Sequence, residues 1–195
     1  MKRSAESQRK TKETQIRAEI SLDGSGQYDI ATGIGFFDHM LTLMSVHGLF
    51  DVSLTAHGDI EVDYHHTVED VGLVLGGTIS QALGDRRGIV RYGQAVIPMD
   101  DALAEVSIDL SNRPYLVFRM PENMPRQGDF EVSLAKEFFR AVSQQGGMNL
   151  HITIAYGENW HHMIEAVFKG FGRALRQAVA MDPRMKEVPS SKGSL

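Results

Sequence analysis

The feature that most constrains this chain is an internal repeat. Residues 20–83 and residues 106–179 carry the same features in the same order. Each copy opens with a short stretch of alternating apolar and polar residues, typical of a strand, and turn-forming residues follow it. Each then contains an amphipathic helical pattern, a second alternating stretch and an apolar helical run. Self-similarity on this scale indicates a tandem duplication of one folding unit.

The pattern also places the helices and strands of each half. Apolar residues at helical spacing predict a helix over residues 36–48 and another over residues 134–147, and the glycines at their ends are typical of C-caps. Strands are predicted at residues 51–55 and 149–153, and the second helices over residues 65–83 and 161–179. Strands with two helices on one sheet face predict an α+β fold.

The boundary between the halves is expected in the segment 84–94, which carries several turn-forming residues. We therefore expect a first half at residues 1–90 and a second half at residues 91–195, packed as one compact unit. Only the two ends, residues 1 to about 10 and residues 190–195, are expected to be mobile without a ligand.

Composition excludes several classes of protein. The 195-residue chain has no cysteine, so any transition metal must be bound by histidine and carboxylate rather than by thiolate. Its net charge of −5 argues against a nucleic-acid partner, because affinity for the phosphate backbone comes from clustered Lys and Arg. There is no apolar run of about eighteen residues and no apolar secretory signal. We expect a soluble, cytoplasmic protein with no membrane partner.

A His-His-x-x-Glu motif stands at the start of the second helix in each half. Its members are His65, His66 and Glu69 in the first half and His161, His162 and Glu165 in the second. On a helix the glutamate shares a face with residues three and four positions before it. Adjacent histidines point about 100° apart, so each is expected to reach a different ion. The motifs predict two metal ions, completed from both halves or from neighbouring subunits. Mn, Fe, Co and Zn all suit these ligands, and a high coordination number would favour Mn or Fe.

The repeat adds two further candidate ligands. His39 and Glu137 each lie nine residues before the glycine at the end of the first helix, Gly48 or Gly146. Both side chains can bind a metal ion, and a solvated helix face is the alternative for Glu137. His47 either lines the site or helps to close the C-terminus of its helix.

The chain resembles the imidazoleglycerol-phosphate dehydratases in a series of motifs. They are GIGFFDHML at 33–41, HGLFDV at 47–52, HHTVEDVG at 65–72, GIVRYG at 88–93, LSNRPYL at 110–116, HHMIEAVFKGFGRALRQA at 161–178 and PSSKG at 189–193. The resemblance runs from about residue 9 to residue 192. It implies two four-stranded sheets, each backed by helices, in ribosomal-protein-S5-domain-2-like halves. It also implies a homo-oligomer of 24 subunits, with two manganese ions in each active site between subunits.

The resemblance assigns metal ligands and substrate contacts by position. The metal ligands would be His39, His65, His66, Glu69, Glu137, His161, His162 and Glu165. Many family members have histidine in place of Glu137, so an oxygen ligand here implies an altered metal preference. The substrate phosphate would be bound by Arg91, Arg113, Lys169, Ser190, Ser191 and Lys192. The last three lie on a tail that would close as a lid. Glu13, His39 and His47 complete the expected substrate contacts.

The implied reaction removes water from D-erythro-imidazoleglycerol phosphate, a small phosphorylated imidazole, and gives imidazole-acetol phosphate in histidine biosynthesis. Two bound metal ions would favour the imidazolate form of the ring. Glu13 matches the N-terminal motif of the family and is the expected base, with Glu165 as the alternative. Two other functions stay open: a di-metal phosphate-ester hydrolase, and a metal-storing or structural shell protein, which would need no phosphate site.

Overall fold

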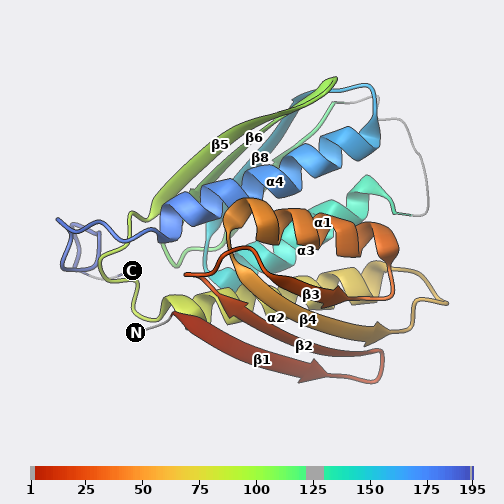
Figure 1. Ribbon diagram of the computed structural model, residues 1–195, viewed down its shortest axis with the longest axis horizontal. Coiled ribbons are helices and arrows are strands. Elements are labelled where there is room, and N and C mark those ends of the chain that lie inside the picture. Colours follow the sequence, from red (N-terminus) through yellow and green to blue (C-terminus); the bar gives the residue numbers. More distant parts are fainter. Residues whose placement is uncertain (1–2, 122–129, 194) are drawn as a thin grey trace.

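Two β-sheets enclose a layer of helices (Figure 1). The computed structural model describes residues 3–121, 130–193 and 195, and within them each half contributes one four-stranded sheet and two helices. The first sheet has the strand order β1-β2-β4-β3 and the second has the equivalent order β5-β6-β8-β7. The predicted α+β fold, a tandem duplication of a sheet backed by helices, is confirmed.

The elements follow one another in the same way in both halves. The strands of the first sheet are β1 (Ser4–Lys10), β2 (Thr14–Ser21), β3 (Tyr28–Ala31) and β4 (Asp51–Gly58). Those of the second are β5 (Tyr92–Met99), β6 (Ala102–Asp109), β7 (Tyr115–Arg119) and β8 (Asn149–Tyr156). The helices are α1 (Gly35–Gly48), α2 (His65–Leu83), α3 (Val132–Gly146) and α4 (Trp160–Val179). In the described part of the chain, none of these helices is long and apolar enough to cross a membrane.

Each sheet buries one face against the helices. In β2, Ile16, Ala18 and Ile20 are buried, and the residues between them are exposed. Strand β6 alternates in the same way. Successive side chains of a strand point to opposite faces, so the period of two in the sequence decides which face meets the helices.

The edge strand β1 lies outside the repeat that the sequence pattern shows. The expectation that residues 1 to about 10 are mobile is wrong for Ser4–Lys10, which pairs with β2 in an antiparallel ladder. Most side chains of this strand are exposed, so it lacks the apolar alternation that a sequence pattern can detect. Its backbone hydrogen bonds to β2, rather than a buried face, hold it in the sheet.

Strand register shows which loop residues are equivalent in the two halves. Strands β2 and β6 are both eight residues long, and each ends opposite the first residue of its central partner, β4 or β8. The residues directly before them, Glu13 and Asp101, therefore occupy equivalent places. After the partner strands, however, the first residues differ, with Asp59 following β4 and Gly157 following β8.

The halves are joined by helix crossings, α1 with α4 and α2 with α3. A Cβ atom on Gly76 of α2 would lie 2.7 Å from the carbonyl oxygen of Val142, and one on Gly172 of α4 would lie 2.5 Å from that of Met44. These separations are too short for a side chain, so glycine permits the close approach of the backbones. Figure 1 shows the four described helices beginning at one end of the molecule.

The predicted C-cap glycines hold for α3 but not for α1. Helix α3 ends with Gly147 in the left-handed conformation, at a φ of 58°. Gly48 instead lies inside α1, and Leu49 takes the left-handed conformation at a φ of 55°. Gly48 has a packing role, because a Cβ atom added there would lie 2.5 Å from the ring of Phe50 and 3.2 Å from the carbonyl oxygen of Gly172.

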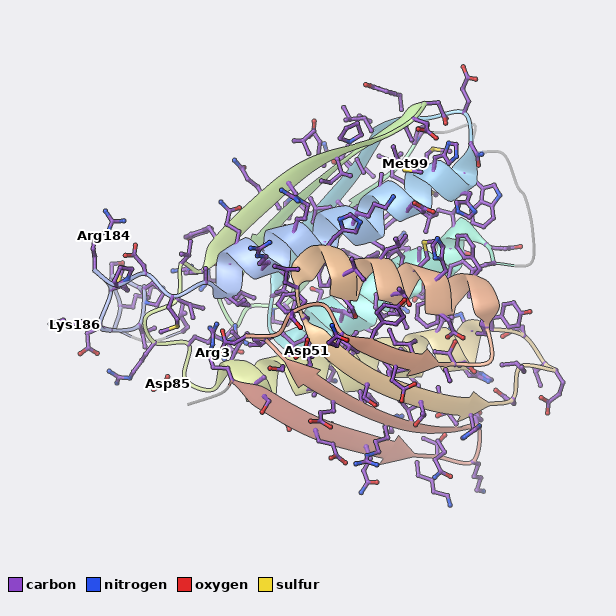
Figure 2. All side chains as sticks on the ribbon, in the orientation of Figure 1. Arg3, Asp51, Asp85, Met99, Arg184 and Lys186 are labelled. Atoms are coloured by element: carbon purple, nitrogen blue, oxygen red, sulfur yellow. The ribbon has the colours of Figure 1, made fainter. Side chains whose placement is uncertain are left out.

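An aromatic core is shared by the two halves. Phe37 of α1 meets Phe138 of α3 edge-on with ring centroids 5.3 Å apart, and Phe138 stacks on Phe168 of α4 at 5.4 Å. All three rings are fully buried. Side chains fill the space between the helices and the sheets (Figure 2).

Candidate active site

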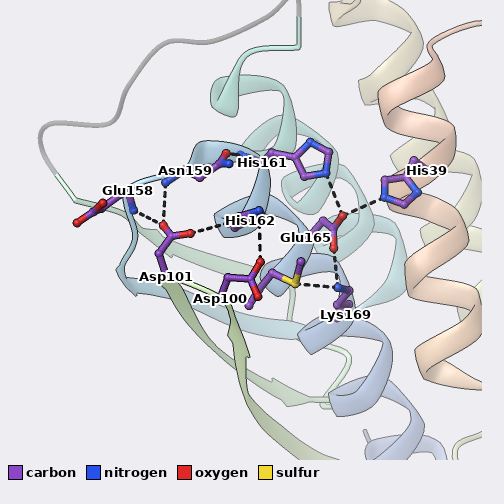
Figure 3. Close-up of polar contacts among 10 residues, drawn as sticks. His39, Asp100, Asp101, Glu158, Asn159, His161, His162, Glu165 and Lys169 are labelled. Carbon is purple, nitrogen blue, oxygen red and sulfur yellow. Dashed lines mark hydrogen bonds and ion pairs between the residues drawn. The ribbon is translucent and has the colours of Figure 1, made fainter.

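A compact cluster of ligand-type side chains lies where α1 meets the start of α4. Oε1 of Glu165 lies 3.0 Å from Nε2 of His39 and 2.9 Å from Nε2 of His161 (Figure 3). The Nζ of Lys169 donates to the other oxygen, Oε2, at 2.5 Å. His161 and Lys169 lie four residues to either side of Glu165, so one helix face presents all three.

The charge of Glu165 is stabilised by its neighbours. Burial alone raises the pKa of this carboxyl group, but the hydrogen bonds from Lys169, His39 and His161 outweigh it and lower the pKa to about 2. Glu165 is buried, whereas His39 is exposed. The cluster therefore offers a carboxylate and two imidazole rings at a solvent-accessible edge.

These three residues fit a divalent transition-metal ion. One ligand atom from each of His39, His161 and Glu165 lies within 4.8 Å of the others. Two nitrogen atoms and one carboxylate oxygen suit Mn, Fe, Co or Zn. Because the site has no thiolate ligand, it does not select for a soft metal ion such as Cu(I). Among the described residues this is the only group of histidine and carboxylate side chains gathered so closely.

The equivalent residues of the first half form a looser cluster. Nε2 of His65 lies 3.5 Å from Oε2 of Glu69 on α2. Glu137 of α3 takes the place of His39, and it forms an ion pair with Arg140. The Nη2 of Arg140 also lies 3.8 Å from Oε1 of Glu69. Two carboxylates and an imidazole fit a hard divalent ion, but here a guanidinium lies between the carboxylates.

The second histidine of each motif is hydrogen-bonded to an aspartate that the sequence reasoning did not single out. Nδ1 of His66 lies 3.0 Å from Oδ2 of Asp59, and Nδ1 of His162 lies 2.5 Å from Oδ1 of Asp101. The hydrogen bond to Asp59 raises the pKa of His66. Both aspartates lie outside the His-His-x-x-Glu motifs, Asp59 seven residues before His66 and Asp101 sixty-one residues before His162, so only the tertiary fold reveals the contacts.

Glu13 lies in the turn between β1 and β2, close to the start of α2. Its carbonyl oxygen accepts a hydrogen bond from the backbone of Asp59 at 3.2 Å, and its charge helps to raise the pKa of His66. The buried Asp70 anchors this turn through Thr14 Oγ1 at 2.5 Å. Among the described residues, none donates a hydrogen bond to the Glu13 carboxylate.

The candidate phosphate-binding residues gather mainly at the other end of the molecule. Arg91 is buried and donates to both oxygens of Asp109, at 2.6 and 3.1 Å, and to the carbonyl oxygen of Pro189 at 2.6 Å. Arg113 lies 3.8 Å from the same aspartate. Ser190, Ser191 and Lys192 follow Pro189 in the tail, where the amide of Lys192 donates to Ser190 Oγ.

The metal-ligand end and the phosphate end are far apart within one chain. The backbone of Arg91 bonds to Ala178 near the end of α4, and His161 stands in its first turn. Seventeen residues at the rise of an α-helix separate these points by about 25 Å. Figure 2 shows Met99, which contacts Lys169, remote from Arg184 and Lys186 of the tail. Of the predicted phosphate contacts, only Lys169 lies beside the metal ligands.

His47 lies near the end of α1, between the two groups. Burial lowers its pKa, and the nearby charges of Lys169 and Arg173 lower it further. A lowered pKa favours the neutral imidazole, which can contact a ligand without adding charge. The structure thus leaves His47 two turns along the helix from His39 rather than in the compact cluster.

Comparison with known proteins gives one family. A family model described as imidazoleglycerol-phosphate dehydratase matches residues 32–175. The chain is 57% identical over 195 residues to the imidazoleglycerol-phosphate dehydratase of Desulfosudis oleivorans, and the match covers all of both chains. It is 55% identical over 188 residues to that of Syntrophobacter fumaroxidans, which covers 96% of this chain and 95% of the relative.

Solved structures agree with this similarity. The crystal structure of the imidazoleglycerol-phosphate dehydratase of Staphylococcus aureus matches with a TM-score of 0.82 at 40% identity, over 92% of this chain and 99% of that one. The corresponding structure from Pyrococcus furiosus matches with a TM-score of 0.84 at 39% identity, over 97% of this chain and 100% of that one.

Proposed function

Because the chain belongs to the imidazoleglycerol-phosphate dehydratase family, we propose that it removes water from D-erythro-imidazoleglycerol phosphate to give imidazole-acetol phosphate in histidine biosynthesis. One structural observation carries the proposal: His39, His161 and Glu165 place their ligand atoms within 4.8 Å of one another. The relatives compared above are all named dehydratases, so hydrolysis and metal storage are not favoured.

We propose that two manganese ions serve each active site, with Fe, Co or Zn as substitutes. One ion would be held by His39, His161 and Glu165, the other by His65, Glu69 and Glu137, with His66 and His162 completing the sites. Bound ions supply the positive charge that stabilises the anionic form of an imidazole ring. Lys169 holds the outer oxygen of Glu165 and so leaves the inner oxygen directed at the two histidines.

A complete active site would require more than one copy of the chain. The metal ligands lie at the start of α4 and the candidate phosphate clamp lies at its end, about 25 Å away along the helix axis. One small phosphorylated substrate cannot reach both groups within one chain. This separation supports a homo-oligomer whose active sites lie between subunits, and we propose the 24-subunit shell. A cytoplasmic location remains a prediction from the biosynthetic role.

Glu13 is the proposed base. Its carboxylate is exposed and has no hydrogen-bond donor among the described residues, whereas both oxygens of Glu165 are already engaged. Asp70 and Thr14 fix the turn that carries Glu13 next to the start of α2. A positioned carboxylate that is free to accept a proton is what removal of a carbon-bound hydrogen requires.

The test is formation of imidazole-acetol phosphate by the purified full-length chain. We expect activity to disappear after chelator treatment and to return with Mn²⁺. Glu13→Gln is expected to lower kcat by about 10²–10⁴-fold, the usual contribution of a general base. The matched control is Glu19→Gln, on the exposed outer face of β2, which should keep full activity. A chain inactive with every one of Mn, Fe, Co and Zn would contradict the proposed function.

A further inference from the structure

We infer that Asp59 and Asp101 are positioning residues for metal binding. Each accepts the Nδ1 proton of the second histidine in a motif, His66 or His162, and this leaves Nε2 of that ring as the ligating nitrogen. The inference rests on the proposed two-metal function, and it concerns residues outside the predicted ligand set.

Asp101 is held so that it has little freedom to rotate (Figure 3). Its Oδ2 accepts backbone hydrogen bonds from Glu158 at 2.5 Å and from Asn159 at 2.8 Å, directly before α4. Its Oδ1 lies 2.5 Å from Nδ1 of His162. One carboxylate thus ties the β5–β6 turn to the start of α4 and fixes the ring plane of His162.

The chemistry of the contact determines the tautomer. A carboxylate only accepts hydrogen bonds, and a neutral imidazole has one N–H donor and one nitrogen with a free lone pair. With Nδ1–H donated to Asp101, the lone pair of His162 must be on Nε2. Metal-bound histidines commonly donate their other nitrogen to a carboxylate, which orients the ring and strengthens the metal bond. Nε2 of His162 lies 3.7 Å from the exposed Asp100, on an accessible side.

The two aspartates come from places that the duplication does not relate. Asp59 directly follows β4, and the residue that directly follows β8 is Gly157. Asp101 directly precedes β6, where the first half has Glu13. The same bond to the same motif position is therefore made in two different ways. If the second histidine of each motif needs a carboxylate at Nδ1, both hydrogen bonds are explained, whereas inheritance from one ancestral contact would place the two aspartates at equivalent positions. It also leaves Glu13 free of the structural role that Asp101 performs.

The contact separates the four motif histidines into two kinds. The first histidines, His65 and His161, direct Nε2 at the glutamate of their own helix, at 3.5 and 2.9 Å. The second histidines have Nδ1 bonded to aspartate, and no described residue hydrogen-bonds Nε2 of His66. The second histidines are therefore prepared to bind an ion that another copy of the chain brings to them.

The competing explanation is a purely structural link between a loop and a helix start. Asp101→Asn distinguishes the two. The asparagine oxygen is expected to keep the backbone hydrogen bonds from Glu158 and Asn159, which would direct the amide NH₂ at Nδ1. His162 would then accept at Nδ1 and carry its proton on Nε2, the wrong tautomer for metal binding. Asp59→Asn is the matched control, because among the described residues no backbone N–H donates to either carboxylate oxygen of Asp59, so the amide can rotate and present oxygen to His66.

The experiment measures Mn²⁺ binding to chelator-treated full-length protein by titration calorimetry, with thermal unfolding of the metal-free protein alongside. Asp101→Asn is expected to weaken one class of Mn²⁺ site by about 10–100-fold, the usual effect of losing an outer carboxylate, with the metal-free Tm unchanged. Asp59→Asn should bind Mn²⁺ as the wild type does, Asp59→Ala should bind it more weakly, and Asp101→Glu should recover part of the loss.

Unchanged Mn²⁺ binding by Asp101→Asn would overturn the inference. The inference would also be overturned if Asp101→Asn and Asp101→Glu lost Mn²⁺ binding equally and both lowered the Tm of the metal-free protein. That pattern would mean that Asp101 only links the loop to the helix. A wild-type protein that binds no Mn²⁺ would instead contradict the proposed function itself, so the two failures are distinguishable.

Discussion

In the second half of the molecule, His161 and Glu165 of α4 meet His39 of α1. Of the two Glu165 oxygens, Lys169 donates to Oε2, and the histidines contact Oε1. In the first half the equivalent residues of α2 face Glu137 of α3, and Arg140 lies between the carboxylates. The backbone positions are equivalent, but the charges are not. The second-half cluster presents its ligands directly to an ion. In the first-half cluster, an ion must first displace the guanidinium of Arg140.

The duplication therefore preserved the positions of the ligands along the helices but not the charges around them. Each cluster has a basic side chain on its glutamate, but Lys169 comes from the motif helix and Arg140 from the neighbouring helix. A cation that shares only the outer oxygen keeps the carboxylate in place for an ion. A cation that bridges two carboxylates occupies the position that an ion would take.

Removing the glutamate of either cluster should have the largest effect. If both clusters hold ions that serve one reaction, Glu165→Gln and Glu69→Gln should each lower kcat/KM by about 10³-fold or more, because each ion contributes several kcal/mol of charge stabilisation. Steady-state assays at saturating Mn²⁺ measure this. Near-normal activity in Glu69→Gln alone would show that only the ion at the second-half cluster serves the reaction.

Substitutions at the two helix crossings test whether the backbones of the two halves pack equally closely, so that the two clusters differ only in their side chains. Gly76→Ala and Gly172→Ala each place a Cβ atom within 2.7 Å of a carbonyl oxygen across the crossing, so we expect similar destabilisation of about 1–3 kcal/mol for the two variants. Gly77→Ala is the control, because no atom of the described residues lies within 4 Å of its added Cβ atom. Denaturant unfolding measures all three, and unequal losses at Gly76 and Gly172 would show that the crossings are not equivalent.

Arg140→Gln should make the first-half cluster behave more like the second. Without the guanidinium beside Glu69 and Glu137, we expect Mn²⁺ to bind the weaker class of site about tenfold more tightly. This change in binding free energy is of the order of one charge interaction near a protein surface. Titration calorimetry measures it, with Lys136→Gln as the control for the exposed charge one turn away. Weaker binding would mean that Arg140 organises the ligands rather than competing with the ion.

The smallest expected effect concerns His47, whose counterpart in the second half is Gln145. Burial and the charges of Lys169 and Arg173 lower the pKa of His47, against a smaller raising effect of Glu165. Its neutral form therefore contributes stability that is complete above its unfolded pKa and is lost as the pH falls through the folded pKa. His47→Gln should lose less stability than the wild type between pH 7 and pH 5, as urea midpoints of metal-free protein would show. An identical pH dependence would contradict the lowered pKa.

Much of this architecture could be predicted from the sequence, for physical reasons that particular residues make clear. The helices at 36–48 and 65–83 have strong apolar periodicity, and the confirmed duplicated fold follows from it. The strand Ser4–Lys10 could not be predicted, because backbone pairing holds it. The paired histidines were visible, whereas their partners Asp59 and Asp101 come from loops that only the fold brings near.

The phosphate-binding residues show the other limit of sequence reasoning. Arg91 and Arg113 were assigned to a clamp by resemblance, and the structure brings them together at Asp109. Nothing in the sequence indicated that they would lie about 25 Å along α4 from the metal ligands. The distance between sites depends on helix direction and on which copy of the chain supplies each part, and neither is encoded in a local pattern.

Whether both clusters bind ions can be decided by counting the Mn²⁺ ions bound per chain in active, dialysed enzyme, by elemental analysis against protein concentration. We expect two ions per chain in the wild type and one in Glu69→Gln, with the ion at His39, His161 and Glu165 retained. One ion per chain in fully active wild-type enzyme would contradict this expectation.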